Sequence, residues 1–218
     1  MLAHATSVEA LRTGTSYACR AEIGGRRWLL LADGPGPERA KHAVEMAFEQ
    51  GPVASVVSTG FCGGLDPELK VGEVFVADRV IGDAGQEWPA RDVQASEGTA
   101  ETGALLSRDR VAVSAAEKAQ LFESTGARVT EMEAAAVADE AQRRDVPFYC
   151  VRVVSDAASD TMPLDFNLYR APSGRFRRGR IIGAALARPT SIRGLMRLNT
   201  DTLRAARRLG DFLVYCRF

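Results

Sequence analysis

Apolar and polar residues recur along this chain with two different periods, and the alternation of the periods predicts strands and helices in turn. Residues 148–154 are almost continuously apolar, which is typical of a buried strand in a parallel sheet. Just before them, residues 134–141 place small apolar side chains at helical spacing, which predicts a helix lying close against that sheet. Asp156 follows the strand. Because ligands of open α/β sheets bind beyond the carboxyl ends of the strands, Asp156 is a candidate site residue.

Other segments extend this α/β pattern. Two apolar runs flank Gly24-Gly25 and predict a hairpin of residues 17–23 and 26–32. Further strands are expected at 1–5, 53–57, from 74 onwards and at 105–114. Further helices are expected after the glycine turn at 34–36 and at 115–126. An arginine-rich tail predicts three more helices, at 177–187, 191–198 and 201–212. Residues 83–102 are small and polar, which is typical of a surface loop and sometimes of a substrate lid. A chain of 218 residues suits one domain over residues 1–218, with a basic helical C-terminal part at about 170–218.

The composition is that of an ordinary globular protein and narrows the possible partners. Apolar residues make up 46% and charged residues 26%, and Lys+Arg and Asp+Glu both number 28. This balance gives no overall attraction to nucleic acid, so no nucleic-acid partner is expected. The 4 cysteines lack metal-ligand spacing and the 2 histidines are isolated, so no metal site is predicted. Reduced cysteines and the absence of a membrane-length apolar run indicate a cytoplasmic protein.

The sequence motifs around the two candidate carboxylates also have simpler interpretations. Residues 130–133 (TEME) match a capping box, in which Glu133 would only satisfy the start of a helix. Asp156 would then cap whatever follows its strand. Taken residue by residue, these interpretations compete with a catalytic one.

The segments EMEAAA (131–136) and PFYCVRVVSDAASD (147–160), together with STGFCGG (58–64), resemble the nucleoside phosphorylase and nucleosidase superfamily, which cleaves the N-glycosidic bonds of nucleosides. The resemblance implies a single three-layer α/β/α domain with a mixed, mostly parallel sheet, no cofactor and a homo-oligomer. It implies that Asp156 donates a proton to the purine, and that Glu133 binds the ribose hydroxyls with Met132 against the sugar.

The resemblance also implies roles for three further groups of residues. The glycine-rich segment would lie beside the ribose or a phosphate, through Gly60, Phe61, Cys62 and Gly63. Val111, Ala112 and Ser155 are candidates for contact with the base. Glu9 stands four residues after Ala5, the spacing at which nucleosidases place the glutamate that activates the attacking water. The alternative for Glu9 is a surface helix, where a carboxylate in the first turn favours the helix dipole.

The expected reaction is release of the base from a purine nucleoside, a 5′-modified adenosine, with water as nucleophile. Phosphorylases of the superfamily commonly carry a serine where Phe61 stands, and phenylalanine offers phosphate no donor. The alternative is phosphorolysis with phosphate as co-substrate, because the basic tail resembles the hopanoid-associated branch of the superfamily. Two non-enzymatic alternatives are a non-catalytic nucleoside-binding protein and a membrane-peripheral protein that contacts lipid weakly through its basic C-terminal helices.

Overall fold

The computed structural model describes residues 1–171, 176–177, 179–181 and 189–218. Within these residues a six-stranded sheet has the order β10-β4-β9-β8-β5-β6. Its strands are β4 (Val56–Gly64), β5 (Val74–Gly82), β6 (Glu87–Pro89), β8 (Glu101–Ser107), β9 (Val129–Glu131) and β10 (Phe148–Asp156). Strand β10 is parallel to β4 and also pairs antiparallel with β5, so five of these strands close into a ring.

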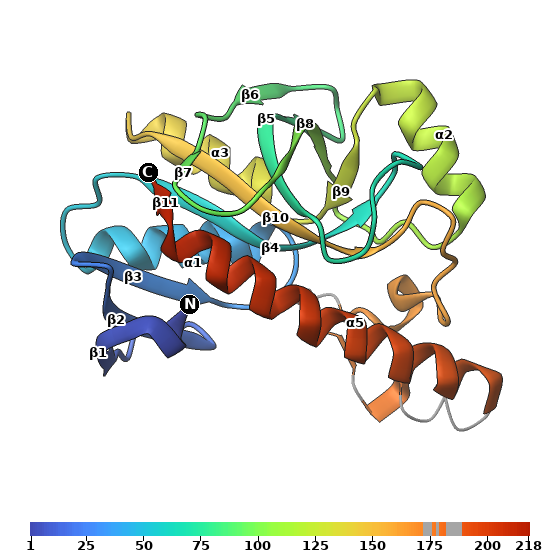
Figure 1. Cartoon of the computed structure of the whole chain (residues 1–218), viewed down its shortest axis with the longest axis horizontal. Helices are drawn as coiled ribbons and strands as arrows, with labels where there is room; N and C mark the ends of the chain where they lie inside the picture. Colours follow the sequence, from blue (N-terminus) through green and yellow to red (C-terminus); the bar gives the residue numbers. More distant parts are fainter. Residues whose placement is uncertain (172–175, 178, 182–188) are drawn as a thin grey trace.

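Helices cover this sheet on two sides, as Figure 1 shows. Helices α1 (Pro37–Glu49) and α3 (Ala134–Arg143) pack against one face of the sheet, where side chains such as Phe75 join the largest apolar cluster. The long helix α5 (Pro189–Val214) packs against the opposite face, where the neighbouring Val74 and Val76 point. Alternate residues of a strand face opposite sides, so β5 contributes to both clusters. The predicted α/β/α arrangement with a mixed, mostly parallel sheet is confirmed.

Helix α2 (Ala115–Thr125) borders the end of the sheet where the strands β8 and β9 finish. It begins at Ser114, whose Oγ accepts a hydrogen bond from the Glu117 N–H, and it stops at Gly126, which is left-handed with φ 67. A left-handed C-cap suits glycine because it has no Cβ to clash. Leu121 and Phe122 pack against a third apolar cluster beneath the helix.

A separate three-stranded antiparallel sheet forms the N-terminal part: β1 (Ala5–Ala10), β2 (Tyr17–Ile23) and β3 (Arg26–Ala32). The predicted hairpin is confirmed with both of its bounds, because Gly24 and Gly25 supply the positive φ of the turn. The predicted strand at 1–5 is wrong. Residues Leu2–His4 form a 3-10 helix (η1), and the strand that follows pairs with β2 rather than joining the main sheet.

Two strand boundaries differ from the prediction for the same reason. The strand expected at 53–57 runs instead from Val56 to Gly64 and includes the glycine-rich segment, because Gly63 and Gly64 still pair with β9. Strand β8, predicted to reach residue 114, ends at Ser107, where the Arg108 N–H donates to the Glu131 carbonyl and the chain turns away. Tertiary pairing lengthens one strand and shortens the other, which a local pattern does not record.

The C-terminal part also differs from its predicted helices. The separate helices expected at 191–198 and 201–212 form one continuous helix, α5, because the polar residues around position 199 do not interrupt it. The helix expected at 177–187 lies mostly outside the described residues. Residues 83–102 are not one continuous loop, since β6 pairs with β5 and β7 (Gln94–Ala95) pairs with β11 (Cys216–Arg217).

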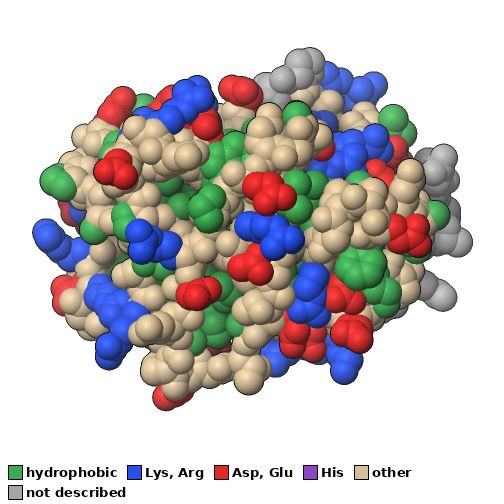
Figure 2. Space-filling view, turned by 90° about the horizontal axis from the view of Figure 1, so that it is seen from above, with side chains coloured by type: hydrophobic (Ala, Val, Ile, Leu, Met, Phe, Trp, Pro, Cys, Tyr) green, Lys and Arg blue, Asp and Glu red, His purple; other side chains and the backbone are tan. Residues whose placement is uncertain are grey.

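Charged side chains of both signs occupy the face of the molecule seen from above in Figure 1. On the face shown in Figure 2, acidic and basic groups are interspersed around apolar ones, in keeping with the balanced composition. In the part of the chain that the structure describes, no helix is both long enough and apolar enough to cross a bilayer.

Candidate active site

A cleft of about 1670 Å³ opens at the carboxyl ends of β4 and β10, and most of the predicted site residues line it. Asp156 is the last residue of β10 and lies opposite Gly63 of β4. A Cβ on Gly63 would come within 3.0 Å of the Asp156 Oδ2 atom. The glycine therefore lets the backbone of β4 pass directly beside the carboxylate. The same cleft is lined by Glu133, Met132, Gly60, Phe61, Cys62, Gly63, Val111, Ala112 and Ser155.

Glu133 stands at the start of α3, but its side chain does not cap that helix. Its Oε1 accepts a hydrogen bond of 2.9 Å from the Gly36 N–H, in the loop before α1. The cap comes from Glu131, whose Oε1 accepts from the Ala134 N–H at 3.0 Å. The capping-box interpretation of Glu133 is wrong, because the side chain of Glu131, on the short strand β9, makes the capping hydrogen bonds instead. Glu133 is thereby left available to a ligand, with 24% of its side chain exposed.

Arg152, in the middle of β10, places a buried positive charge under Glu133. Its Nη2 lies 2.5 Å from Glu131 Oε2 and donates to Ser58 Oγ at 2.7 Å, and its Nη1 lies 3.7 Å from Glu133 Oε2. Burial alone would lower the pKa of Arg152, but its anionic surroundings, Glu131 foremost, raise it above the usual range.

The pKa of Glu133 is changed in opposite directions by its two charged neighbours, the Glu131 carboxylate and the Arg152 guanidinium. Burial and the neighbouring charge of Glu131 raise the pKa of Glu133 to about 7, against the opposing effects of Arg152 and the Gly36 N–H. Glu133 therefore titrates near neutral pH. A carboxylate in this state is sensitive to any ligand group that donates hydrogen bonds to it.

Asp156 is held by a buried ammonium. The Lys118 Nζ atom, on α2, lies 2.5 Å from Asp156 Oδ2 and 2.7 Å from the Ala157 carbonyl oxygen. The two side chains are 0% and 6% exposed. Ser155 Oγ lies 2.7 Å from the other carboxylate oxygen, Oδ1, and 3.1 Å from the Cys62 carbonyl oxygen, and its single proton serves one of these acceptors at a time. Both Asp156 oxygens thus have hydrogen-bonding neighbours on the protein side.

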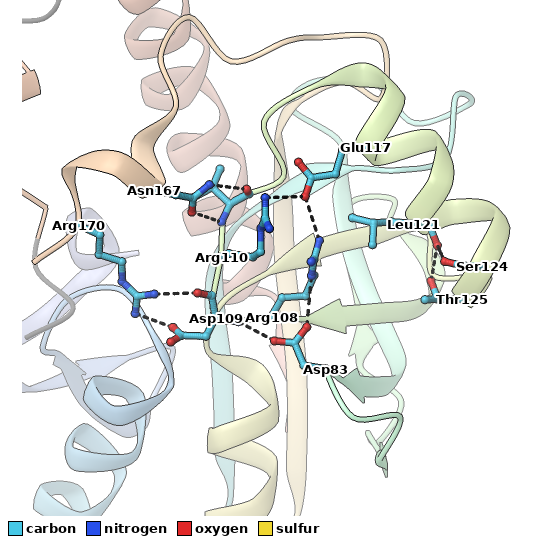
Figure 3. A network of polar contacts seen from close by, with 11 residues as sticks. Asp83, Arg108, Asp109, Arg110, Glu117, Leu121, Ser124, Thr125, Asn167 and Arg170 are labelled. Carbon is cyan, nitrogen blue, oxygen red and sulfur yellow. Dashed lines mark hydrogen bonds and ion pairs between the residues drawn. The ribbon is translucent and has the colours of Figure 1, made fainter. Parts of the chain in front are cut away.

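Two of the three base candidates, Val111 and Ala112, lie on the loop between β8 and α2, while Ser155 lies on β10. The Val111 N–H donates to Asn167 Oδ1 at 2.9 Å, and the Val111 carbonyl accepts from Asn167 Nδ2 at 3.0 Å (Figure 3). The backbone of Val111 is therefore already occupied by the short helix η2 (Phe166–Tyr169). Ala112 is buried beside it and lines the cleft.

An ion pair between Arg170 and Asp109 connects the loop before α2 to the segment after η2. Arg170 Nη1 donates to the Asp109 carbonyl at 2.8 Å, and its Nη2 lies 2.6 Å from Asp109 Oδ1 (Figure 3). A Cβ on Gly36 would overlap the same guanidinium. The loop before α1, the loop before α2 and the η2 segment consequently meet at one rim of the cleft.

The structure does not bring Glu9 together with the other carboxylates through any hydrogen bond or ion pair of the described residues. Glu9 lines the same cleft, but from β1 of the separate N-terminal sheet. Its side chain is 70% exposed, and its charged neighbour is Arg20 at 3.9 Å. This placement argues against Glu9 as the group that activates water, since a base held loosely in solvent is not oriented toward a substrate.

Three residues of the site were missed in the sequence. Arg152 interrupts an otherwise apolar strand, and a charge at such a position signals a buried ion pair. Glu131 stands inside the EMEAAA motif and was given no role. Lys118 carried no signal, because a Glu-Lys pair near the start of a helix is typical of a solvent-exposed surface.

Comparison with known proteins shows which family the chain belongs to. A sequence model of the phosphorylase superfamily matches residues 3–97 and 86–186. The chain belongs to that superfamily. It is similar to the 5′-methylthioadenosine/S-adenosylhomocysteine nucleosidase of Marinomonas sp., with 31% identity over 193 residues that cover 73% of this chain and 82% of the relative. The corresponding nucleosidase of Tolumonas auensis is 27% identical over 191 residues, 75% of this chain and 83% of the relative.

Solved structures agree on the fold of this superfamily member. An S-adenosylhomocysteine nucleosidase from Streptococcus pyogenes superposes with a TM-score of 0.74 at 17% identity, over 98% of this chain and 88% of its own. A 5′-methylthioadenosine/S-adenosylhomocysteine nucleosidase from Neisseria meningitidis superposes with a TM-score of 0.67 at 21% identity, over 95% and 90%. The predicted membership of the nucleoside phosphorylase and nucleosidase superfamily, and with it an enzyme that acts on N-glycosidic bonds, is confirmed.

Proposed function

We propose that this protein hydrolyses the N-glycosidic bond of a 5′-modified adenosine and releases adenine. The observation that carries the proposal is the pair of carboxylates, Glu133 and Asp156, that face one cleft at the ends of two adjoining elements. The names of the relatives support the substrate class, because the similar proteins of Marinomonas sp. and Tolumonas auensis are nucleosidases of 5′-methylthioadenosine and S-adenosylhomocysteine.

The two carboxylates have separate tasks in this proposal. Breaking the C1′–N9 bond builds positive charge on the ribose and negative charge on the purine. Glu133, when ionised, accepts hydrogen bonds from the ribose hydroxyls and stabilises the developing cation, with Met132 against the sugar. Asp156 lies beside the glycine-rich strand β4 and delivers a proton to the departing purine. Ala112 and Ser155 lie on the side of the cleft where the base is placed, with Val111 contributing its side chain.

Water rather than phosphate is the nucleophile in this proposal, because the Arg152 guanidinium beside the glycines of β4 already interacts with side chains of the protein. Arg152 contacts Glu131, Glu133 and Ser58, and the Ser58 hydroxyl accepts from it. Phe61 contributes no hydrogen-bond donor to an anion. Phosphate would meet two carboxylates there, while the guanidinium beside the glycines is already paired with anions of the protein.

A second candidate is the same cleavage on a nucleoside with a long apolar 5′ substituent. The cleft of about 1670 Å³ exceeds the range of roughly 300–1,000 Å³ that small-molecule sites occupy. Part of its further lining is apolar and comes from β3 and the segment before β4, including Leu29, Leu31 and Val53. Such a wall would receive a hydrocarbon chain, with water or phosphate as the nucleophile.

One experiment separates these possibilities. Adenine release is measured from 5′-methylthioadenosine, S-adenosylhomocysteine, adenosine and a 5′-alkyl adenosine, with and without phosphate, and the sugar product is identified. Free sugar in phosphate-free buffer supports the hydrolase. Strict dependence on phosphate with a sugar 1-phosphate product would overturn hydrolysis, and tight binding without release from any substrate would overturn catalysis altogether.

We also propose that the protein works in the cytoplasm as a homo-oligomer, as the superfamily resemblance implies. Light scattering on the purified chain measures its mass in solution, and a monomer at micromolar concentration would contradict this proposal. Salt-dependent sedimentation with anionic vesicles tests the alternative that α5 contacts a membrane surface.

A further inference from the structure

Lys118 occupies a position that a surface helix does not normally give to a lysine. Its side chain is fully buried, and it is the buried residue of α2. Lysine is almost never fully buried unless it is paired. Its Nζ reaches the Asp156 carboxylate and the Ala157 carbonyl, and the residue lines the active-site cleft.

This pairing changes what Asp156 can do as an acid. A carboxylate that lies 2.5 Å from an ammonium in a buried site is stabilised in its ionised form. An ionised carboxylate has no proton to give. In the resting site the transferable proton is therefore on Lys118, one hydrogen bond behind the group that faces the base.

We propose that Lys118 is the proton reservoir of this site and acts on the base through Asp156, an inference that rests on the proposed function. As the C1′–N9 bond breaks, its electron pair stays with the purine. One Lys118 N–H bond breaks while an Asp156 O–H bond forms, and Asp156 passes a proton to the purine nitrogen. Water adds to C1′ and releases a proton to solvent, and Lys118 regains one from solvent. Lys118 is thus a positioning residue, because it does not touch the substrate.

The test uses two substrates that differ only in their need for a proton. Adenine must be protonated as it leaves 5′-methylthioadenosine, whereas 4-nitrophenolate leaves the corresponding 5-methylthio-riboside as a stable anion. Lys118→Arg keeps the positive charge and keeps Asp156 ionised, but a guanidinium does not release its proton. We expect its kcat for adenine release to fall by about 100-fold, in the range of a lost general acid, and its nitrophenolate release to change by less than about 3-fold.

Lys118→Met is the variant to compare with Lys118→Arg. If Lys118 were only structural, losing its charge would lower adenine release more than keeping the charge does, whereas the proposal predicts the reverse order. Lys118→Met removes the ammonium that lies 2.5 Å from the Asp156 carboxylate and favours its ionised form, so Lys118→Met should release adenine faster than Lys118→Arg. Equal losses on both substrates, full activity of Lys118→Arg, or less adenine release by Lys118→Met than by Lys118→Arg would each overturn the proposal. A wild-type protein that cleaves neither substrate would instead overturn the proposed function.

A measurement on the wild-type protein tests the proposal even if the Lys118→Arg variant does not fold. Single-turnover rates are measured across mixtures of H₂O and D₂O with both substrates. The proton that passes from Lys118 through Asp156 to the purine is in transit only during adenine release, which predicts a larger solvent isotope effect on adenine release than on nitrophenolate release. Equal solvent isotope effects for both substrates would show that no proton transfer accompanies departure of the base.

Discussion

Replacing Glu133 by glutamine should stabilise the folded protein at neutral and alkaline pH while weakening its site. The carboxyl group prefers its protonated form in the folded state, since its pKa is raised from 4.5 to about 7 by burial and by Glu131. The neutral glutamine side chain would imitate that protonated form. Its amide can still accept the hydrogen bond that the Gly36 N–H gives to Glu133.

The expected size follows from the shift of the pKa. A rise from 4.5 to about 7 corresponds to roughly 3 kcal/mol, at about 1.4 kcal/mol for each pKa unit. Because 24% of the side chain is exposed, solvent screens part of this cost, and we expect about 2 kcal/mol. The folded state binds the proton more tightly than the unfolded chain. The contribution of Glu133 to stability is therefore complete below about pH 4.5 and is lost as the pH rises through about 7.

Urea unfolding at closely spaced pH values from 5 to 8.5 measures this effect. The free energy of unfolding of Glu133→Gln should lie within about 1 kcal/mol of the wild-type value near pH 5 and exceed it by about 2 kcal/mol at pH 8. Glu45→Gln is the control, because Glu45 is a more exposed glutamate, 4.0 Å from Lys41, on the surface of α1. Parallel curves for the wild type and Glu133→Gln would refute the reasoning, and adenine release by the variant at the wild-type rate would exclude Glu133 from the site.

Three further substitutions test the remaining parts of the site. Asp156→Asn should cost about 3 kcal/mol of stability, because it leaves the Lys118 ammonium buried without its partner. In urea unfolding, the double variant with Lys118→Met should recover most of that loss. Additive losses in the double variant would contradict the coupling of the two residues. Glu9→Gln should release adenine within about 2-fold of the wild-type rate because its side chain is exposed, and a loss of about 100-fold would restore it as the group that activates water. Gly63→Ala should lower kcat more than stability, because the new Cβ lies 3.0 Å from Asp156 Oδ2 and displaces the carboxylate; an unchanged kcat would show that the carboxylate tolerates the contact.

Local patterns in the sequence determined those elements whose shape depends on near neighbours. The hairpin of β2 and β3 was predicted with both bounds because its turn glycines and its apolar runs lie within a few residues of one another. The small residues of α3 and the apolar run of β10 were predicted because each element buries a face that its own periodicity reveals. The paired motifs identified the superfamily, and with it the positions of Glu133 and Asp156.

Tertiary structure decided which charges meet. Lys118 and Asp156 are 38 positions apart, and only the packing of α2 against the end of β10 buries them together. The Arg152 guanidinium lies between Glu131 and Ser58 because β10 runs beside β4 and next to the start of α3. Periodicity in a sequence records whether a side chain is buried, but it does not record what that side chain is buried against. The electrostatic environment of a carboxylate depends on those neighbours, so the raised pKa of Glu133 and the ion pair of Asp156 with Lys118 became known only from the fold.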